Sequence, residues 1–288
     1  MFAATALGIF DGKRPQDCKE LPRLLDACVA LGLLEKRGNG EYVNTPESDR
    51  FLRSDSPDTL SGYILYSNSV LYPMWANLED AVREGAPRWK QTFNLDGPIF
   101  SAFFRTDESM REFLKGMHGV GRLSSPAVAA AFDLSRFHHL VDLGGASGHL
   151  AQAARERYPH LQTTVFDLPA VKKVYPETVA GDFFTDPLPP ADLYALGRIL
   201  HDWSDSKCRP LLRKVCDTLP SGGALLIAEK LLDDRNIPAH MQSLNMLVCT
   251  EGRERTADEY AALLHETGFS TVESRRAGAP LDATLAIK

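Results

Sequence analysis

The sequence lacks any hydrophobic run long enough to span a membrane. A transmembrane helix needs about 20 consecutive apolar residues, and no stretch of the 288 residues approaches this length. The first residues, MFAATALGIFD, also lack the basic head and cleavable apolar stretch of a secretory signal peptide. We therefore expect a protein that is neither inserted into a membrane nor secreted.

Paired cysteines are also missing. The five cysteines are odd in number, scattered along the chain and never spaced as C-x-x-C: Cys18, Cys28, Cys208, Cys216 and Cys249. This pattern disfavours disulfides and a zinc knuckle, and it favours free thiols in a reducing cytoplasm. No plausible set of His, Cys and Asp metal ligands appears either, so we expect no metal.

The sequence has no excess of positive charge. Its 38 acidic and 32 basic residues give a formal net charge of −6, which provides no global attraction for nucleic acid or anionic lipid. The contents of 44% hydrophobic and 24% charged residues are typical of a soluble globular protein. The length allows two domains, or one large α/β domain with a helical addition.

Residues 1–135 are predicted to form a mainly helical, winged-helix-like domain. The segment LPRLLDACVALGLLE has apolar residues at helical spacing, and a glycine turn and the short strand EYVNT follow it. This outline is also found in DNA-binding proteins, but between Leu21 and Arg53 five basic residues are matched by five acidic ones. A recognition helix normally carries a basic excess, so an architectural role is favoured over DNA binding. Two more amphipathic helices are expected at residues 63–85 and 109–132.

Residues 136–288 alternate between strand and helix patterns, which predicts an α/β fold with a mostly parallel, Rossmann-like sheet covered on both faces. The last two strands follow one another after only a short turn, so one of them is expected to run antiparallel. The strands are expected at residues 139–145, 162–169, 193–200, 223–232, 270–277 and 282–288, and the helices at 148–159, 206–219 and 256–269.

A glycine turn after the first of these strands predicts a nucleotide site. In VDLGGASGHL, Gly144, Gly145 and Gly148 permit a tight turn and the close approach of a ligand to the backbone. The spacing differs from the G-x-G-x-x-G of dinucleotide-binding proteins, so the turn alone is a weak signal. The next strand ends in Asp167, about 20 residues further on, where a carboxylate can accept hydrogen bonds from both ribose hydroxyls.

The motif GDFF supplies a third element, because Asp182 and Phe183 are expected at the tip of the following strand, beside an adenine ring. Three elements then converge on one edge of the sheet and predict a bound nucleoside-type ligand. The strands carry no G-x-x-x-x-G-K-[ST] motif, which argues against a triphosphate.

Several longer motifs resemble those of class I S-adenosylmethionine-dependent methyltransferases, and in particular the small-molecule O-methyltransferases that include plant caffeate enzymes. The resemblance is strongest to the acetylserotonin (hydroxyindole) branch. It covers nearly the whole chain and rests on LLDACVALGLLE, VDLGGASG, VFDLP, GDFFTDPLPPADLYALGRILHDWSD and SLNMLVCTEGRERTADEY. The resemblance implies S-adenosylmethionine as cofactor, S-adenosylhomocysteine as product and a small aromatic hydroxyl compound as substrate.

The resemblance also assigns the site residues. The cofactor residues are Asp142, Gly144, Gly145, Gly148, Asp167, Leu168, Gly181, Asp182, Phe183 and Arg198. Three residues match substrate-facing positions, namely Asp202, Asn245 and Cys249, although the animal acetylserotonin enzymes carry glutamine in place of Cys249. Ala146 stands where the family usually has a glycine. Trp203 is expected to have a packing role.

His201, in RILHDWSD, is identified by the resemblance as the general base. A neutral phenol or indole hydroxyl is a poor nucleophile, so a base whose pKa lies near neutrality helps as the new bond forms, and imidazole meets this need. The resemblance supplies Glu229 and Glu254 as carboxylates that flank the imidazole and hold one tautomer. Alternatively, Glu229 is an ordinary charge at a strand end, and Glu254 forms a salt bridge with a neighbouring arginine.

Family members pair through their N-terminal helices, so the resemblance also implies a homodimer, with residues 63–75 as candidates for the contact. The chain is shorter than the family pattern before Phe2, between Asp11 and Leu21, and between Val171 and Gly181. Two other functions remain open. One is a relative that has kept the cofactor but now catalyses decarboxylation or hydroxylation, and the other is a winged-helix regulator that senses S-adenosylmethionine.

Overall fold

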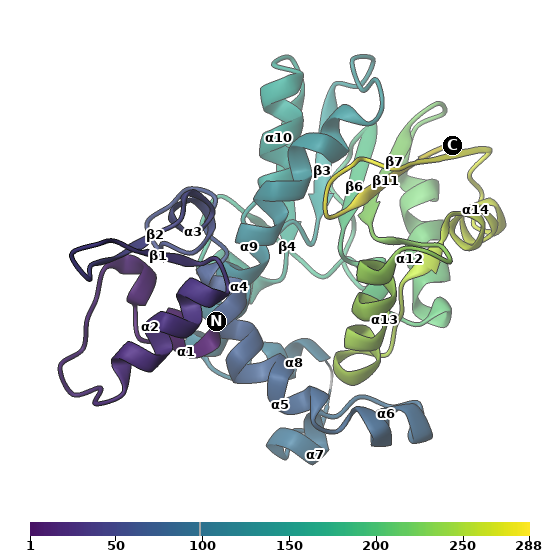
Figure 1. The fold of residues 1–288 in the computed structure, drawn as a ribbon. Helices are drawn as coiled ribbons and strands as arrows, with labels where there is room; N and C mark the ends of the chain where they lie inside the picture. The colour runs from purple at the N-terminus through teal and green to yellow at the C-terminus, as the bar shows by residue number, and fades with distance from the viewer. Residues whose placement is uncertain (98) are drawn as a thin grey trace. The chain divides into compact units, whose positions relative to one another are not determined.

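A seven-stranded sheet forms the centre of the C-terminal half of the chain (Figure 1). The strand order is β10-β11-β7-β6-β3-β4-β5. The bounds are β3 (His139–Leu143), β4 (Gln162–Asp167), β5 (Val179–Ala180), β6 (Leu193–Gly197), β7 (Ala224–Glu229), β10 (Thr271–Arg275) and β11 (Asp282–Ile287). Strands β7, β6, β3, β4 and β5 are parallel, whereas β11 is antiparallel to both of its neighbours. The predicted α/β class is confirmed, and so is the prediction that one of the last two strands of the chain, here β11, runs antiparallel.

This structure is a computed structural model that describes residues 1–97 and 99–288. By their contacts the residues divide into two units. One contains Met1–Pro73 and Phe103–Val120, and the other contains Met74–Ala102 and Gly121–Lys288. The division at residue 135 that the sequence suggests, with domains at 1–135 and 136–288, stays a prediction.

Helices cover both faces of the sheet. On one face lie α12 (Asp205–Thr218) and α14 (Ala257–Glu266), and on the other lie α10 (His149–Arg157) and the end of α9 (Asp107–Ala130). Successive side chains of a strand point to opposite faces, so Val141 packs with the first pair of helices and Leu140 with the second. All six residues of β7 are buried, as a central strand requires.

The first unit is built on a helix and a small hairpin. Helix α1 (Phe2–Ala6) and helix α2 (Leu21–Ala30) precede strands β1 (Leu34–Lys36) and β2 (Tyr42–Asn44), which pair antiparallel. Helices α3 (Pro46–Phe51) and α4 (Ser61–Tyr66) follow. The apolar side of α2 packs into a small core because Leu25 and Cys28 are buried against Leu34 and Phe10. This is the helix-and-hairpin outline that the sequence predicts.

The prediction of one continuous helix over residues 63–85 is wrong, because this segment forms several short helices. After α4 the chain forms one π-helical turn (Ser67–Leu71) and α5 (Tyr72–Trp75), and only then α6 (Leu78–Glu84). The helix breaks at Asn77, whose side-chain amide donates to the Thr92 hydroxyl at 3.0 Å. Two short helices follow in sequence, α7 (Trp89–Phe93) and α8 (Ile99–Phe103).

The sequence patterns also missed a helix, α13 (Ile237–Cys249). Its start carries a recognisable signal, since the Asn236 side chain accepts a hydrogen bond from the Ala239 N–H and Pro238 occupies the first turn. The structure also contains α11 (Pro169–Lys172), β8 (Leu231–Leu232), β9 (Arg255–Thr256) and the 3-10 helices Ile9–Asp11 and Leu200–Asp202. Among the residues that the structure describes, no helix combines the length and apolar character needed to cross a bilayer.

Candidate active site

His201 lies in a tight turn at the carboxyl end of β6. The turn is the short 3-10 helix Leu200–Asp202, and it begins after Arg198, whose φ of 59° lies in the left-handed region that non-glycine residues seldom adopt. Glu229 ends the neighbouring strand β7. Its Oε1 accepts hydrogen bonds from the backbone N–H groups of Ile199 and Leu200 at 3.0 Å and of His201 at 3.4 Å. One carboxylate therefore caps the turn that carries the imidazole.

Two glutamates approach the same ring nitrogen of the imidazole, and one of them, Glu254, is hydrogen-bonded to it. Nδ1 of His201 lies 2.7 Å from Oε1 of Glu254 and 3.3 Å from Oε2 of Glu229, and all three side chains are buried. The other nitrogen, Nε2, lies 3.8 Å from Oδ1 of Asp202, which is beyond hydrogen-bond distance. A proton on Nδ1 is therefore donated to Glu254, whereas Oε2 of Glu229 lies close to Nδ1 but has no hydrogen-bond partner among the described residues. In the neutral imidazole, Nε2 then keeps its lone pair for a different partner.

The structure therefore brings together the residues predicted to be catalytic. Glu254 does not pair with a neighbouring arginine, since Arg255 pairs with Asp205 at 2.7 Å and Arg253 with Glu259 at 2.8 Å. Within the described residues, the ligand atoms of His201, Glu229 and Glu254 also lie within 4.8 Å of one another, a spacing that a metal ion accepts. The 2.7 Å hydrogen bond already accounts for this closeness.

Electrostatics give this cluster a high affinity for protons. Burial lowers the pKa of His201, but the carboxylates of Glu229, Glu254 and Asp202 raise it by more, and the resulting pKa is about 9. Burial raises the pKa of Glu229 to about 7 and that of Asp202 to about 6, against the opposing effect of His201. The imidazole is therefore a strong base whose protonated form the glutamates stabilise.

The predicted cofactor residues lie at the same edge of the sheet. The glycine turn follows β3 and leads into α10, and Asp142 lies beneath it, where its carboxylate accepts a hydrogen bond from the Ala151 N–H at 3.3 Å. A Cβ on Gly145 would lie 2.5 Å from Cγ of Asp142, so only glycine fits above this carboxylate. Burial raises the pKa of Asp142 to about 7. Asp142 supports the turn from below.

Asp167 connects the glycine turn with the next loop. Its Oδ2 accepts from the Ala146 N–H at 2.9 Å and its Oδ1 from the Leu168 N–H at 2.7 Å, while the Gly181 N–H donates to its backbone oxygen at 2.9 Å. Burial raises the pKa of its carboxyl to about 6, although the two backbone hydrogen bonds oppose this effect.

The GDFF loop approaches the turn from the other side. A Cβ on Gly144 would lie 3.4 Å from the Phe183 ring, so ring and turn are in near contact. The Asp182 carboxylate accepts from the Phe184 N–H at 2.8 Å and so shapes its own loop. The glycine turn, Asp167 and Phe183 therefore lie close together. Arg198 follows the end of β6, and its Nη1 is buried and has no hydrogen-bond partner among the described residues.

The predicted substrate residues are all buried. The amide oxygen of Asn245, on α13, accepts a hydrogen bond from the Trp75 indole N–H at 2.9 Å, which directs the Asn245 NH₂ group elsewhere. Cys249 ends the same helix, and burial raises the pKa of its thiol above the usual range. Trp203 packs against Phe184 at 4.9 Å between ring centroids, which confirms the predicted packing role. No sequence pattern predicts the Trp75 contact, because its partner lies far along the chain.

Comparison with known proteins places these features in one family. Residues 75–270 match the model of the O-methyltransferase domain. The acetylserotonin O-methyltransferase of Bos taurus is 39% identical, and the match covers 100% of this chain and 93% of that protein. The chain belongs to the O-methyltransferase family. It is an S-adenosylmethionine-dependent O-methyltransferase with a small-molecule substrate, as the sequence resemblance predicts.

Two further relatives, both named as methyltransferases, agree with this assignment. The crystal structure of human N-acetylserotonin methyltransferase in complex with SAM superposes with a TM-score of 0.94 at 38% identity, over 100% of this chain and 92% of that one. A probable bifunctional dTTP/UTP pyrophosphatase/methyltransferase protein of Homo sapiens is 42% identical, over 93% of this chain and 46% of that protein.

The residues of this O-methyltransferase fit its cofactor. The orphaned guanidinium nitrogen of Arg198 is a buried donor that needs an acceptor, and each Asp167 oxygen keeps a lone pair beyond its backbone hydrogen bond. With its methyl group on a positively charged sulfur, S-adenosylmethionine supplies an electrophile that needs no metal. The individual cofactor contacts stay predictions.

Asp167→Asn tests the predicted ribose contact. Hydrogen bonds to a charged group are worth about 1.5–3 kcal/mol each, so the dissociation constant for S-adenosylmethionine should rise by about 10- to 100-fold. Because the pKa of Asp167 is about 6, wild-type affinity should also weaken as the pH falls through that value. Isothermal titration calorimetry measures both effects. Asp217→Asn, on the exposed side of α12, should change neither, and equal affinities for wild type and Asp167→Asn would exclude the contact.

Ala146→Gly should stabilise the enzyme. Ala146 has a φ of 48°, where a Cβ costs about 1–2 kcal/mol, while glycine costs about 0.5–1 kcal/mol in chain entropy. The net gain of up to about 1 kcal/mol should raise the Tm by about 1–3 °C in calorimetry. The same substitution at Ala154, inside α10, should lower the Tm. A lower Tm for both variants would contradict the strain at Ala146.

Proposed function

We propose that His201 is the general base that activates the substrate hydroxyl for methylation. The observation that carries this proposal is the clamp on Nδ1 by Glu254 at 2.7 Å and Glu229 at 3.3 Å. The clamp fixes the tautomer with the proton on Nδ1, so that Nε2 accepts the hydroxyl proton as the oxygen attacks. The imidazolium that forms lies between two carboxylates, which stabilise its charge.

The substrate in this proposal is a small aromatic compound with a free hydroxyl group, and hydroxyindoles are the first class to test. Two relatives named for acetylserotonin methylation share 38–39% identity with this chain. Asn245, held by Trp75, offers an amide NH₂ donor for an acceptor on the substrate. Cys249 offers no comparable polar group for a substrate amide, which favours hydroxyindoles without an amide side chain over N-acetylserotonin itself.

A direct screen tests the activity and the substrate class together. Purified enzyme is incubated with labelled S-adenosylmethionine and with phenols, hydroxyindoles or hydroxyquinones, and product mass is read by mass spectrometry. The proposal expects the mass of one added methyl group on an aromatic hydroxyl compound. A product that has lost carbon dioxide or gained one oxygen would instead identify decarboxylation or hydroxylation.

We also propose a cytoplasmic homodimer that forms through the N-terminal helices. All five cysteines are free in the structure, which suits a reducing compartment. Tyr72 on α5 is 69% exposed and Leu31 after α2 is 66% exposed, and such large apolar side chains on the surface favour a protein contact. Light scattering during gel filtration should give twice the chain mass of 31.8 kDa. A monomer at micromolar concentration would exclude the dimer.

A further inference from the structure

We propose that Arg255 and Gly252 are positioning residues that hold the His201 turn against Glu254. Gly252 lies shortly before β9 and Arg255 is the first residue of β9. The inference rests on the proposed role of His201 as base. We infer in addition that residues outside the catalytic trio (His201, Glu229 and Glu254) set the distance between the imidazole and Glu254.

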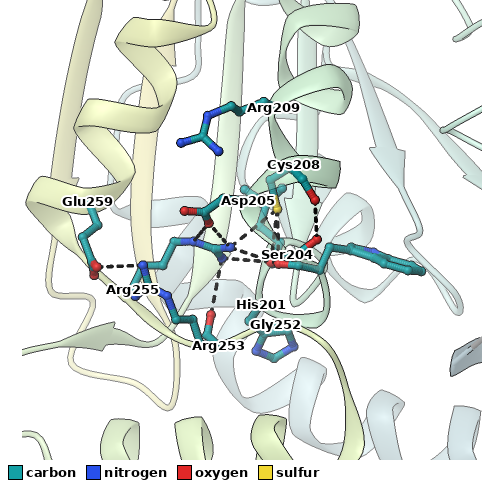
Figure 2. Close-up of polar contacts among 12 residues, drawn as sticks. His201, Ser204, Asp205, Cys208, Arg209, Gly252, Arg253, Arg255 and Glu259 are labelled. Atoms are coloured by element: carbon teal, nitrogen blue, oxygen red, sulfur yellow. Dashed lines mark hydrogen bonds and ion pairs between the residues drawn. The ribbon is translucent and has the colours of Figure 1, made fainter. Parts of the chain in front are cut away.

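Arg255 binds the backbone of the turn on both sides of His201 (Figure 2). Its Nη1 donates to the carbonyl oxygen of Leu200 at 2.9 Å, and its Nη2 donates to that of Trp203 at 3.0 Å. The guanidinium also pairs with Asp205, in the first turn of α12, through Nε at 3.0 Å and Nη2 at 2.7 Å. Arg255 is 1% exposed, so its two hydrogen bonds to the turn carbonyls are buried, where charge-assisted hydrogen bonds are strong.

Glu254 and Arg255 are adjacent, and side chains of consecutive residues in an extended segment point in opposite directions. Glu254 reaches the imidazole, whereas Arg255 reaches the turn carbonyls and Asp205. One short segment therefore contacts both the side chain of His201 and the backbone around it. Because both contacts originate from the same peptide, a shift of Arg255 moves the carboxylate that orients the imidazole.

Gly252 supplies a second, independent contact with the turn. A Cβ at this position would lie 2.7 Å from the carbonyl carbon of Asp202, and it would be closer still to the Trp203 nitrogen and the His201 carbonyl oxygen. Real Cβ atoms essentially never come this near to backbone, so any side chain here would push the turn away. The Gly252 backbone is therefore in close contact with the backbone of the turn at His201, Asp202 and Trp203.

Arg255→Lys is the first test, since lysine keeps the charge but lacks the planar fork that bridges two carbonyls and a carboxylate. The expected result is a fall in kcat of about 10- to 100-fold, because a misplacement of about 1 Å costs about this much. The KM for the hydroxyl substrate and the dissociation constant for S-adenosylmethionine should stay within about twofold. Arg253→Lys is the matched control: Arg253 pairs with Glu259 and is half-exposed, so this variant should keep the wild-type kcat.

The pH profile separates positioning from mere stability. The groups facing His201 are the carboxylates of Glu229, Glu254 and Asp202, with Arg198 beside Asp202. A looser Glu254 stabilises the imidazolium less, so the acid limb of kcat/KM should move to lower pH in Arg255→Lys. A purely structural role would lower the Tm and leave the limb and the kcat of the folded enzyme unchanged, and that result would overturn the proposal.

Gly252→Ala gives an independent test of the same geometry. It should lower kcat and shift the acid limb in the same direction, with cofactor affinity retained. If both variants fail to fold, Asp205→Asn removes only the partner of Arg255 at a side chain that is 40% exposed, and an unchanged kcat in this variant would overturn the proposal. Retained activity in His201→Ala would instead refute the general base, whereas an inactive His201→Ala beside a fully active Arg255→Lys would refute only the positioning role.

Discussion

His201→Ala should lower kcat by about 10²- to 10⁴-fold, the usual contribution of a general base. Affinity for S-adenosylmethionine should remain nearly unchanged, because most of the predicted cofactor residues belong to the glycine turn, the end of β4 and the GDFF loop, and Arg198, which precedes the His201 turn, keeps its own side chain in this variant. Single-turnover assays measure the methyl-transfer step, and calorimetry measures cofactor binding in the same preparation.

The alanine variant also leaves two buried glutamates without their partner. Removing one member of a buried ion pair costs about 3–5 kcal/mol when the remaining charge stays ionised. Here Glu229, whose pKa is about 7, can take up a proton instead, so the folded state should survive at neutral pH. His160→Ala, which removes only an exposed ring that contacts backbone carbonyls, should keep full activity. Parallel loss of cofactor binding and turnover in His201→Ala would mean that the histidine is structural.

The sheet, and the neighbouring positions of two of the three predicted catalytic residues, follow from local patterns. The alternation of strands and helices predicts parallel neighbours, so residues at the ends of β6 and β7 must meet at one edge. This places His201 near Glu229 before any contact is known. The roles of Glu229 and Glu254 came from the resemblance to the family, and for Glu254 the strand pattern gives no position either, because this residue lies in an irregular segment after α13.

The predictions that were wrong or missing depend on contacts between distant residues. The helix expected over residues 63–85 breaks where Trp75 is bound by Asn245 and Asn77 by Thr92. Local apolar spacing carries no information about such partners. Arg255 shows the same limit: the sequence offers it as a partner for the adjacent Glu254, but α12 brings Asp205 within 2.7 Å and the two neighbours turn apart.

Glu254→Gln should reduce kcat by about 10²-fold or more and move the acid limb of the pH profile to lower pH. The base is active only when neutral, so wild-type kcat/KM should rise with pH until the imidazole loses its proton, at about 9 in the free enzyme. Glutamine removes one of the negative charges that raise this pKa. Its amide also binds Nδ1 without fixing the tautomer, which in comparable triads costs up to about 10⁴-fold.

The negative charge of Glu254 should also affect how the free energy of unfolding depends on pH, and this dependence can be measured without any assay of catalysis. The folded-state pKa of His201 is raised above its ordinary value of 6.5, so the folded protein binds this proton more tightly than the unfolded chain does. The resulting stabilisation is complete below about pH 6.5 and is lost as the pH rises through about 9.

Glu254→Gln should therefore lower the free energy of unfolding more at pH 6 than at pH 10, as measured by urea denaturation at both values. Glu251→Gln, whose carboxylate pairs with Lys207 on the surface, should show no such difference, and an equal loss at both pH values in Glu254→Gln would mean that Glu254 does not stabilise a protonated His201.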